Sequence, residues 1–222
     1  MVDLLIVGDS WAMGEWDWDN ENRYACTHKG LEQYFLDAGY SVQNKSIGGA
    51  SNSQSILTLQ LLDLNQYKSI LWFQTDPLRD ITDSQLFLKE YNSFQKVIEH
   101  QKELLNKTYL NLNSLEIEIL CIGGCSKLEL DLIKYYPNLT PIIPSVMEFL
   151  IPDFKHPEIW FSGWFQDIDR QFSIDCINKF LYNKQLQDQL GWLYRDLFWP
   201  DGRHPNRWGH KKIFEYLNAN LS

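Results

Sequence analysis

The stretch "LLIVGDSWAMGEW", residues 4–16, decides the fold. An apolar run over 3–7 stops at Gly8, which is typical of a buried strand in a parallel sheet. A glycine at a strand end lets the backbone bend sharply and expose the next hydroxyl, as a nucleophile turn requires. Ser10 after Asp9 is equally typical of a helix cap. The stretch therefore predicts a first strand and leaves two roles open for Ser10.

Strand and helix patterns alternate along the rest of the chain. The predicted strands span 3–7, 40–47, 69–74, 115–124 and 139–144, and the predicted helices span 28–39, 51–65, 86–105, 174–190 and 207–219. This alternation predicts an α/β fold with a parallel sheet covered by helices on both faces, in three layers. We expect a single domain over 1–222, with an irregular segment at about 134–172 that holds five of the eight prolines.

Composition excludes several classes of partner. The net charge of −9 and the absence of a basic block argue against nucleic acid as a ligand. No apolar stretch has the length of a signal peptide or a membrane span, so we expect a cytoplasmic protein that does not insert into membranes. Gly8 and Gly14 are separated by five residues and followed by Glu15, which does not match a phosphate-binding loop. Nothing in the composition indicates an oligomeric state.

Cysteine spacing gives no indication of a metal or of a disulfide framework. The four cysteines are dispersed, and only Cys121 and Cys125 are close together, without the second pair that a zinc site needs. We therefore predict no metal, no cofactor and reduced thiols.

The segment "WPDGRHPNRWGHKKIFEYL", residues 199–217, gives the Ser10 hydroxyl a predicted partner. A serine hydroxyl becomes a nucleophile when a base takes its proton, and a carboxylate that orients the base improves it. His204 and Asp201 can supply both groups from one turn. The alternative is that His204 is a surface residue stiffened by Pro205. We expect His210, further along the helix, to lie at the surface.

These two blocks resemble the first and last blocks of the SGNH hydrolases, also called the GDSL family. The resemblance rests on Gly8-Asp9-Ser10 after the first strand and on Asp201-Gly-Arg-His204-Pro205-Asn206 before the last helix. It implies a flavodoxin-like sheet of about five strands and hydrolysis of esters, thioesters or acetylated sugars without a metal. It also implies a catalytic triad of Ser10, His204 and Asp201.

Between these two blocks, the sequence matches the conserved blocks of the family only in part. In "NKSIGGASN", residues 44–52, the spacing favours Gly49 as an oxyanion-hole donor beside the N–H of Ser10. The family's third block carries an Asn as a further donor, whereas this chain has "WFQTDPLRD", residues 72–80. Thr75 could donate in its place, and Gln74 could offer an amide, but a carboxylate at Asp76 would repel an oxyanion. Arg79 is expected to pair with Asp76 or to contact an acidic substrate.

Aromatic residues near Ser10 suggest the substrate. Trp11 is expected at the substrate rim, and "EWDWDNE", residues 15–21, is either a solvated loop or part of that rim. Together with the resemblance, these residues favour a serine hydrolase of small carboxylic esters, with O-acetyl groups on carbohydrate as the preferred substrate. The alternative is a non-catalytic binding or structural protein of the same fold, such as a virion or assembly component.

Overall fold

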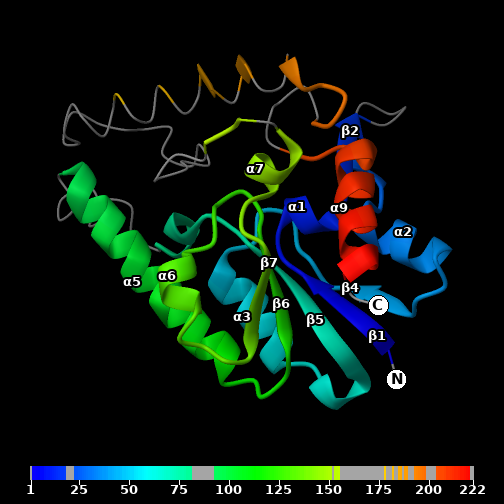
Figure 1. Ribbon diagram of the computed structural model, residues 1–222, viewed down its shortest axis with the longest axis horizontal. Helices are drawn as coiled ribbons and strands as arrows, with labels where there is room; N and C mark the ends of the chain where they lie inside the picture. The colour runs from blue at the N-terminus through cyan, green and yellow to red at the C-terminus, as the bar shows by residue number, and fades with distance from the viewer. Residues whose placement is uncertain are drawn as a thin grey trace.

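A five-stranded parallel sheet forms the centre of the protein in the computed structural model (Figure 1). The structure describes residues 2–18, 23–81, 93–151, 153–155, 178, 182, 185–186, 188–189, 193–198 and 204–220. The strands are β1 (Val2–Val7), β4 (Val42–Asn44), β5 (Tyr67–Gln74), β6 (Ile119–Gly123) and β7 (Leu139–Ile143), in the order β4-β1-β5-β6-β7. This is the flavodoxin-like order, and it confirms the predicted α/β fold.

Helices cover the sheet on both faces (Figure 1). One face carries α2 (Leu31–Asp37), α7 (Val146–Leu150) and α9 (Arg207–Asn220), and the other carries α3 (Asn52–Gln60), α5 (Phe94–Asn113) and α6 (Leu130–Ile133). The short α1 (Ser10–Met13) follows β1, and two 3-10 turns, η1 (Leu64–Gln66) and η2 (Pro77–Asp80), flank β5. The three-layer arrangement of the prediction is thus present.

Side chains that alternate along the central strands contribute to the hydrophobic core on both faces of the sheet. Leu4 and Ile6 of β1 belong to the cluster with α2 and α9, whereas Leu5 and Val7 belong to the cluster with α3 and α5. All four side chains are buried. Successive side chains of a strand point to opposite faces, so a strand covered on both sides needs an unbroken apolar run. This is why residues 4–7 are apolar.

Three elements differ from the prediction. Residues expected to form a loop after Ser10 instead form an antiparallel hairpin, β2 (Glu15–Trp18) and β3 (Tyr24–His28). Helix α5 continues to Asn113, past the predicted end at residue 105, because Tyr109 and Leu112 extend its buried face. Its predicted start at residue 86 lies outside the described residues.

The segment at 134–172, expected to be irregular, contains β7 and α7 in its first part. The short strand predicted at 139–144 is therefore confirmed as the fifth strand of the sheet. The second part of the segment, from residue 156 onward, lies outside the described residues. In the part of the chain that the structure describes, no helix combines the length and apolarity needed to cross a membrane.

The sheet order places the point where the connections change side at the ends of β1 and β5. The connections of these two neighbouring strands leave toward opposite sides, and ligands of such sheets bind beyond the carboxyl ends at this point. Gly8 allows the two strand ends to approach closely, because a Cβ atom on Gly8 would lie 2.7 Å from Cβ of Phe73. The fold therefore brings Asp9 and Ser10 next to the residues that follow β5.

Candidate active site

Ser10 and His204 meet at the carboxyl end of β1. Ser10 is the first residue of α1, and its Oγ lies 2.8 Å from Nε2 of His204. The serine is nearly buried, at 9% exposure. This is the distance at which an imidazole can take the proton of a hydroxyl nucleophile. The two predicted residues, from opposite ends of the chain, are thus brought together.

The turn that carries His204 is held from both sides. A β-bridge pairs Pro205 with Phe198. Asn206 accepts hydrogen bonds from two N–H groups in the first turn of α9, as an N-cap does, and its amide donates to the carbonyl of Arg195. A Cβ on Gly209 would lie 2.5 Å from a main-chain carbonyl oxygen, so only glycine fits there. The motif around His204 therefore fixes the position of the turn that carries the imidazole.

Asp201, the predicted orienting carboxylate, lies outside the described residues, and its role stays a prediction.

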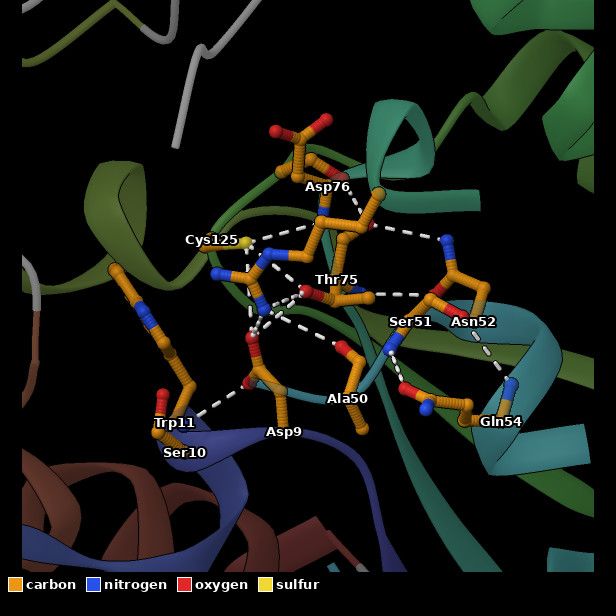
Figure 2. Close-up of polar contacts among 12 residues, drawn as sticks. Asp9, Ser10, Trp11, Ala50, Ser51, Asn52, Gln54, Thr75, Asp76 and Cys125 are labelled. Carbon is orange, nitrogen blue, oxygen red and sulfur yellow. Dashed lines mark hydrogen bonds and ion pairs between the residues drawn. The ribbon is translucent and has the colours of Figure 1, made fainter. Parts of the chain in front are cut away.

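Asp9 organises the nucleophile turn (Figure 2). It caps α1, with Oδ1 accepting the N–H of Trp11 at 2.9 Å. Its Oδ2 accepts the hydroxyl of Thr75 at 2.7 Å and the guanidinium of Arg79, also at 2.7 Å. The side chain of Asp9 is completely buried and that of Arg79 is 12% exposed. A buried ion pair therefore lies next to Ser10 in the chain.

Arg79 connects three strand ends. Besides Asp9 at the end of β1, its Nη1 donates to the Thr75 hydroxyl at 2.7 Å and to the carbonyl of Ala50 at 3.3 Å, in the loop after β4. Burial by itself would lower the pKa of Arg79, but Cys125 and the carboxylates of Asp9 and Asp76 raise it overall. The guanidinium is therefore charged. Its ion-pair partner is Asp9 and not Asp76, the partner expected from the sequence, while contact with an acidic substrate stays a prediction.

The polar atoms of Thr75 and Asp76 form hydrogen bonds within the protein. The Thr75 hydroxyl proton is directed at Asp9, and its N–H donates to Oδ1 of Asn52 at 3.0 Å. Asp76 caps η2 by accepting the N–H of Leu78 at 2.9 Å, and its carboxylate points away from Ser10 (Figure 2). Neither side chain directs a hydrogen-bond donor at Ser10.

Gln74 is also engaged within the core. Its amide nitrogen donates to the hydroxyl of Ser126 at 2.8 Å and to the carbonyl of Lys127 at 2.7 Å. Its carbonyl oxygen accepts the hydroxyl of Tyr109 at 2.7 Å. The three residues that the sequence analysis considered for the third block thus stabilise the end of β5.

Asn52 and Cys125 belong to this network and were not identified from the sequence. Asn52 pairs with both main-chain groups of Thr75, and the Cys125 sulfur lies 3.1 Å from the Asp76 nitrogen. Burial, and to a smaller extent the Asp9 carboxylate, raises the pKa of Cys125 to about 12. The thiol is therefore neutral and does not act as a nucleophile in place of the Ser10 hydroxyl. An Asn in a helix start and a Cys after a strand carry no local signal of such a contact.

The loop between β4 and α3 lies against the nucleophile turn. Asn44 donates to the carbonyl of Ala12 at 2.9 Å, and the N–H of Ile47 donates to the carbonyl of Gly8 at 3.0 Å. Gly49 has a positive φ of 74°, which favours glycine. Within the described ranges, the N–H groups of Gly49 and Ser10 make no hydrogen bond. Both are therefore available as donors.

Aromatic rings surround the imidazole. Trp11, expected at the substrate rim, is instead buried, with its ring centroid 6.2 Å from that of Phe198 and 6.5 Å from that of His204. Trp16 of the hairpin lies on His204 as well, at 6.5 Å, and its Nε1 donates to the carbonyl of Ser10 at 3.1 Å. The hairpin is thus attached to the site.

Helix α9 contacts the β2–β3 hairpin through an ion pair. The carboxylate of Glu15 binds the guanidinium of Arg207, with Oε1 at 2.8 Å from Nη2, and this contact joins the hairpin to α9. His210 was expected at the surface, and this expectation was wrong: α9 packs inward there, and the ring is fully buried beside Gly30. Burial lowers the pKa of His210 to about 4.

Among the residues that the structure describes, no group of three His, Cys, Asp or Glu side chains could hold a metal ion.

Comparison with known proteins finds similarity in structure. No family model and no curated protein matches the sequence. The chain is similar to the crystal structure of TesA, with 15% identity, a TM-score of 0.45, and 99% and 98% of the two chains covered. It is similar to the psychrotrophic esterase EstA from Pseudoalteromonas sp., with 13% identity, a TM-score of 0.44 and coverage of 99% and 96%. It is also similar to a lipase/acylhydrolase from Enterococcus faecalis, with 11% identity, a TM-score of 0.44 and coverage of 100% and 95%. Proteins this distant can differ in their reactions, so the chemistry has to be argued from the residues of the site.

Proposed function

We propose that this protein is a metal-independent serine hydrolase of carboxylic esters, with Ser10 as the nucleophile and His204 as the general base. The observation that carries the proposal is the 2.8 Å contact between Ser10 Oγ and His204 Nε2. We favour small acyl groups on carbohydrate as substrates, because aromatic residues surround Ser10 and because the sequence resembles the SGNH hydrolases.

The reaction proceeds through an acyl-enzyme. His204 takes the proton of Ser10 as Oγ attacks the carbonyl carbon of the ester. The negative charge that develops on the carbonyl oxygen is stabilised by the N–H groups of Ser10 and Gly49. His204 then gives the proton to the leaving alcohol, the ester bond breaks, and the acyl group stays on Ser10. Water attacks the acyl-enzyme by the same steps and releases the acid.

Asp9 and Asp201 have different roles in this proposal. Asp9 holds the turn in which Ser10 lies, through its contacts with the Trp11 N–H and Arg79. Asp201 orients His204 and stabilises its charged form, as in other triads. The third donor of the oxyanion hole has no candidate at Gln74, Thr75 or Asp76, because their polar atoms bind elsewhere.

The lack of a third donor at Gln74, Thr75 and Asp76 is the observation that favours the alternative, a non-catalytic protein of the same fold. Loss of one donor costs roughly 100-fold to 1000-fold in rate, so the site would be slower than a complete one. A slow site still reacts with an activated phosphonate, whereas a non-catalytic one does not.

The test is labelling with a fluorophosphonate probe, followed by mass spectrometry of the labelled peptide. We expect stoichiometric labelling at Ser10 in the natural chain and none in the Ser10→Ala variant. Ser41→Ala is the matched control, because Ser41 is exposed and lies outside the site. Circular dichroism checks that each variant is folded. Folded natural protein that is not labelled, or a Ser10→Ala variant that keeps full turnover of an aryl ester, contradicts the proposal.

A further inference from the structure

We infer that the β2–β3 hairpin carries a carbohydrate-binding subsite, in which Trp18 and Tyr24 form a stacking platform for a pyranose ring. The inference deepens the proposed function, on which it rests for the position of the reacting ester. Binding to the platform can nevertheless be measured without any reaction.

The hairpin places three aromatic rings in a row. Trp18 and Tyr24 are directly paired across the two strands, and Trp16 is two residues before Trp18, so all three side chains lie on one face of the hairpin. The ring centroids of Trp18 and Tyr24 are 5.6 Å apart, and those of Tyr24 and Trp16 are also 5.6 Å apart. The row ends at His204, 6.5 Å from Trp16. It therefore leads to the base that acts on Ser10.

The inner end of the row is anchored. Trp16 donates its Nε1 hydrogen to the carbonyl of Ser10. On its other side, a Cβ on Gly48 would lie 3.3 Å from the Trp16 ring, so the ring packs closely against the loop that holds Gly49. The Glu15–Arg207 ion pair at the start of the hairpin ties it to α9. The row thus has a fixed position relative to the nucleophile.

The outer end of the row is open to solvent. Trp18 is 60% exposed and Tyr24 is 39% exposed. Two neighbouring exposed aromatic side chains form an apolar surface patch of the kind that binds ligands. A ligand that stacks there could present an ester to Ser10.

A sugar ring suits this platform better than an acyl chain. An alkyl chain gains affinity by being enclosed, and an open ring face covers only one side of it. A pyranose has one face of C–H groups that can lie on an aromatic ring while its hydroxyls stay hydrated. The net charge of −9 disfavours anionic ligands.

The kinetic test compares two esters, β-D-glucose pentaacetate and ethyl acetate, which has no ring. For Trp18→Ala we expect the ratio of kcat/KM for the pentaacetate to that for ethyl acetate to fall by about three- to tenfold, through KM of the pentaacetate. Tyr24→Ala should lower the ratio in the same direction. Tyr135→Ala is the matched control, because Tyr135 is an exposed aromatic residue just after α6 and should leave the ratio unchanged. An unchanged ratio in Trp18→Ala overturns the inference.

A binding test separates the inference from the proposed function. Calorimetry on the Ser10→Ala chain measures binding of cellotetraose, xylotetraose and chitotetraose. Binding of at least one, weakened by adding Trp18→Ala and not by adding Tyr135→Ala, supports the platform even if the natural chain hydrolyses no ester. Binding of none at 10 mM overturns the platform, as does a Trp18→Ala variant that loses activity toward methyl octanoate while the pentaacetate is unaffected.

Discussion

Arg79 forms a buried ion pair with Asp9, the residue before Ser10, with Nη1 2.7 Å from Oδ2. The same guanidinium reaches the Thr75 hydroxyl and the Ala50 carbonyl. Because one cation joins the ends of β1 and β5 to the loop after β4, removing it should affect both folding and the site.

Arg79→Gln should lower the free energy of unfolding by roughly 3–5 kcal/mol, because it leaves the Asp9 carboxylate buried without its cation. Urea unfolding at neutral pH measures this. In the double variant Asp9→Asn/Arg79→Gln, no unpaired charge remains, so its loss should be smaller than the sum of the two single losses. A loss below 1 kcal/mol in Arg79→Gln would show that the pair does not support the fold.

Thr75→Val should lower stability by about 1–3 kcal/mol, because the Thr75 hydroxyl lies between Asp9 and Arg79 and its loss leaves both with one partner fewer. We expect kcat for an aryl acetate to fall by less than about tenfold. A drop of about 100-fold to 1000-fold with unchanged stability would instead identify Thr75 as an oxyanion donor. Urea unfolding and steady-state kinetics on the same preparations decide between these results.

His204→Ala should lower kcat for an aryl acetate by several orders of magnitude, since the Ser10 hydroxyl loses its base. The double variant Ser10→Ala/His204→Ala should be no slower than either single variant, because the two residues act as one unit. Initial rates at saturating ester, corrected for the rate in buffer, provide the comparison. Losses that multiply in the double variant would mean that the residues act independently.

Stability should fall as the pH is lowered from about 6.5 toward 4, partly through His210. Its pKa is about 4 in the folded protein and near 6.5 when unfolded, so between these values the unfolded chain binds the extra proton. The full difference corresponds to about 3 kcal/mol. His210→Leu should remove this part of the pH dependence.

Urea unfolding of the natural chain and of His210→Leu between pH 4 and 7.5 measures the difference. The pKa of His28 is also lowered, by burial and by Arg207, but His28 is present in both proteins and its contribution cancels. Parallel curves for the two proteins would rule out His210 as the source.

Much of the fold could be predicted from local patterns. The apolar run at 3–7 and the helix that begins at Arg207 are determined by neighbouring residues, and both occur where the sequence indicates them. The hairpin was missed, because "EWDW" has a single charged residue, Asp17, between its two tryptophans, and so short an alternation does not distinguish a strand from a loop. The burial of His210 was missed for a related reason: it depends on how α9 packs against the rest of the chain.

By itself, the sequence determined the alternation of the five sheet strands with helices and the likeness between its two terminal blocks and a serine–histidine site. Those features depend on residues close together in the chain. Only the tertiary structure decided that Arg79 binds Asp9, that Thr75 directs its hydroxyl there, and that Trp16 lies on His204. The physical reason is that buried polar groups bind whichever partner packing brings within reach, and packing joins residues far apart in sequence.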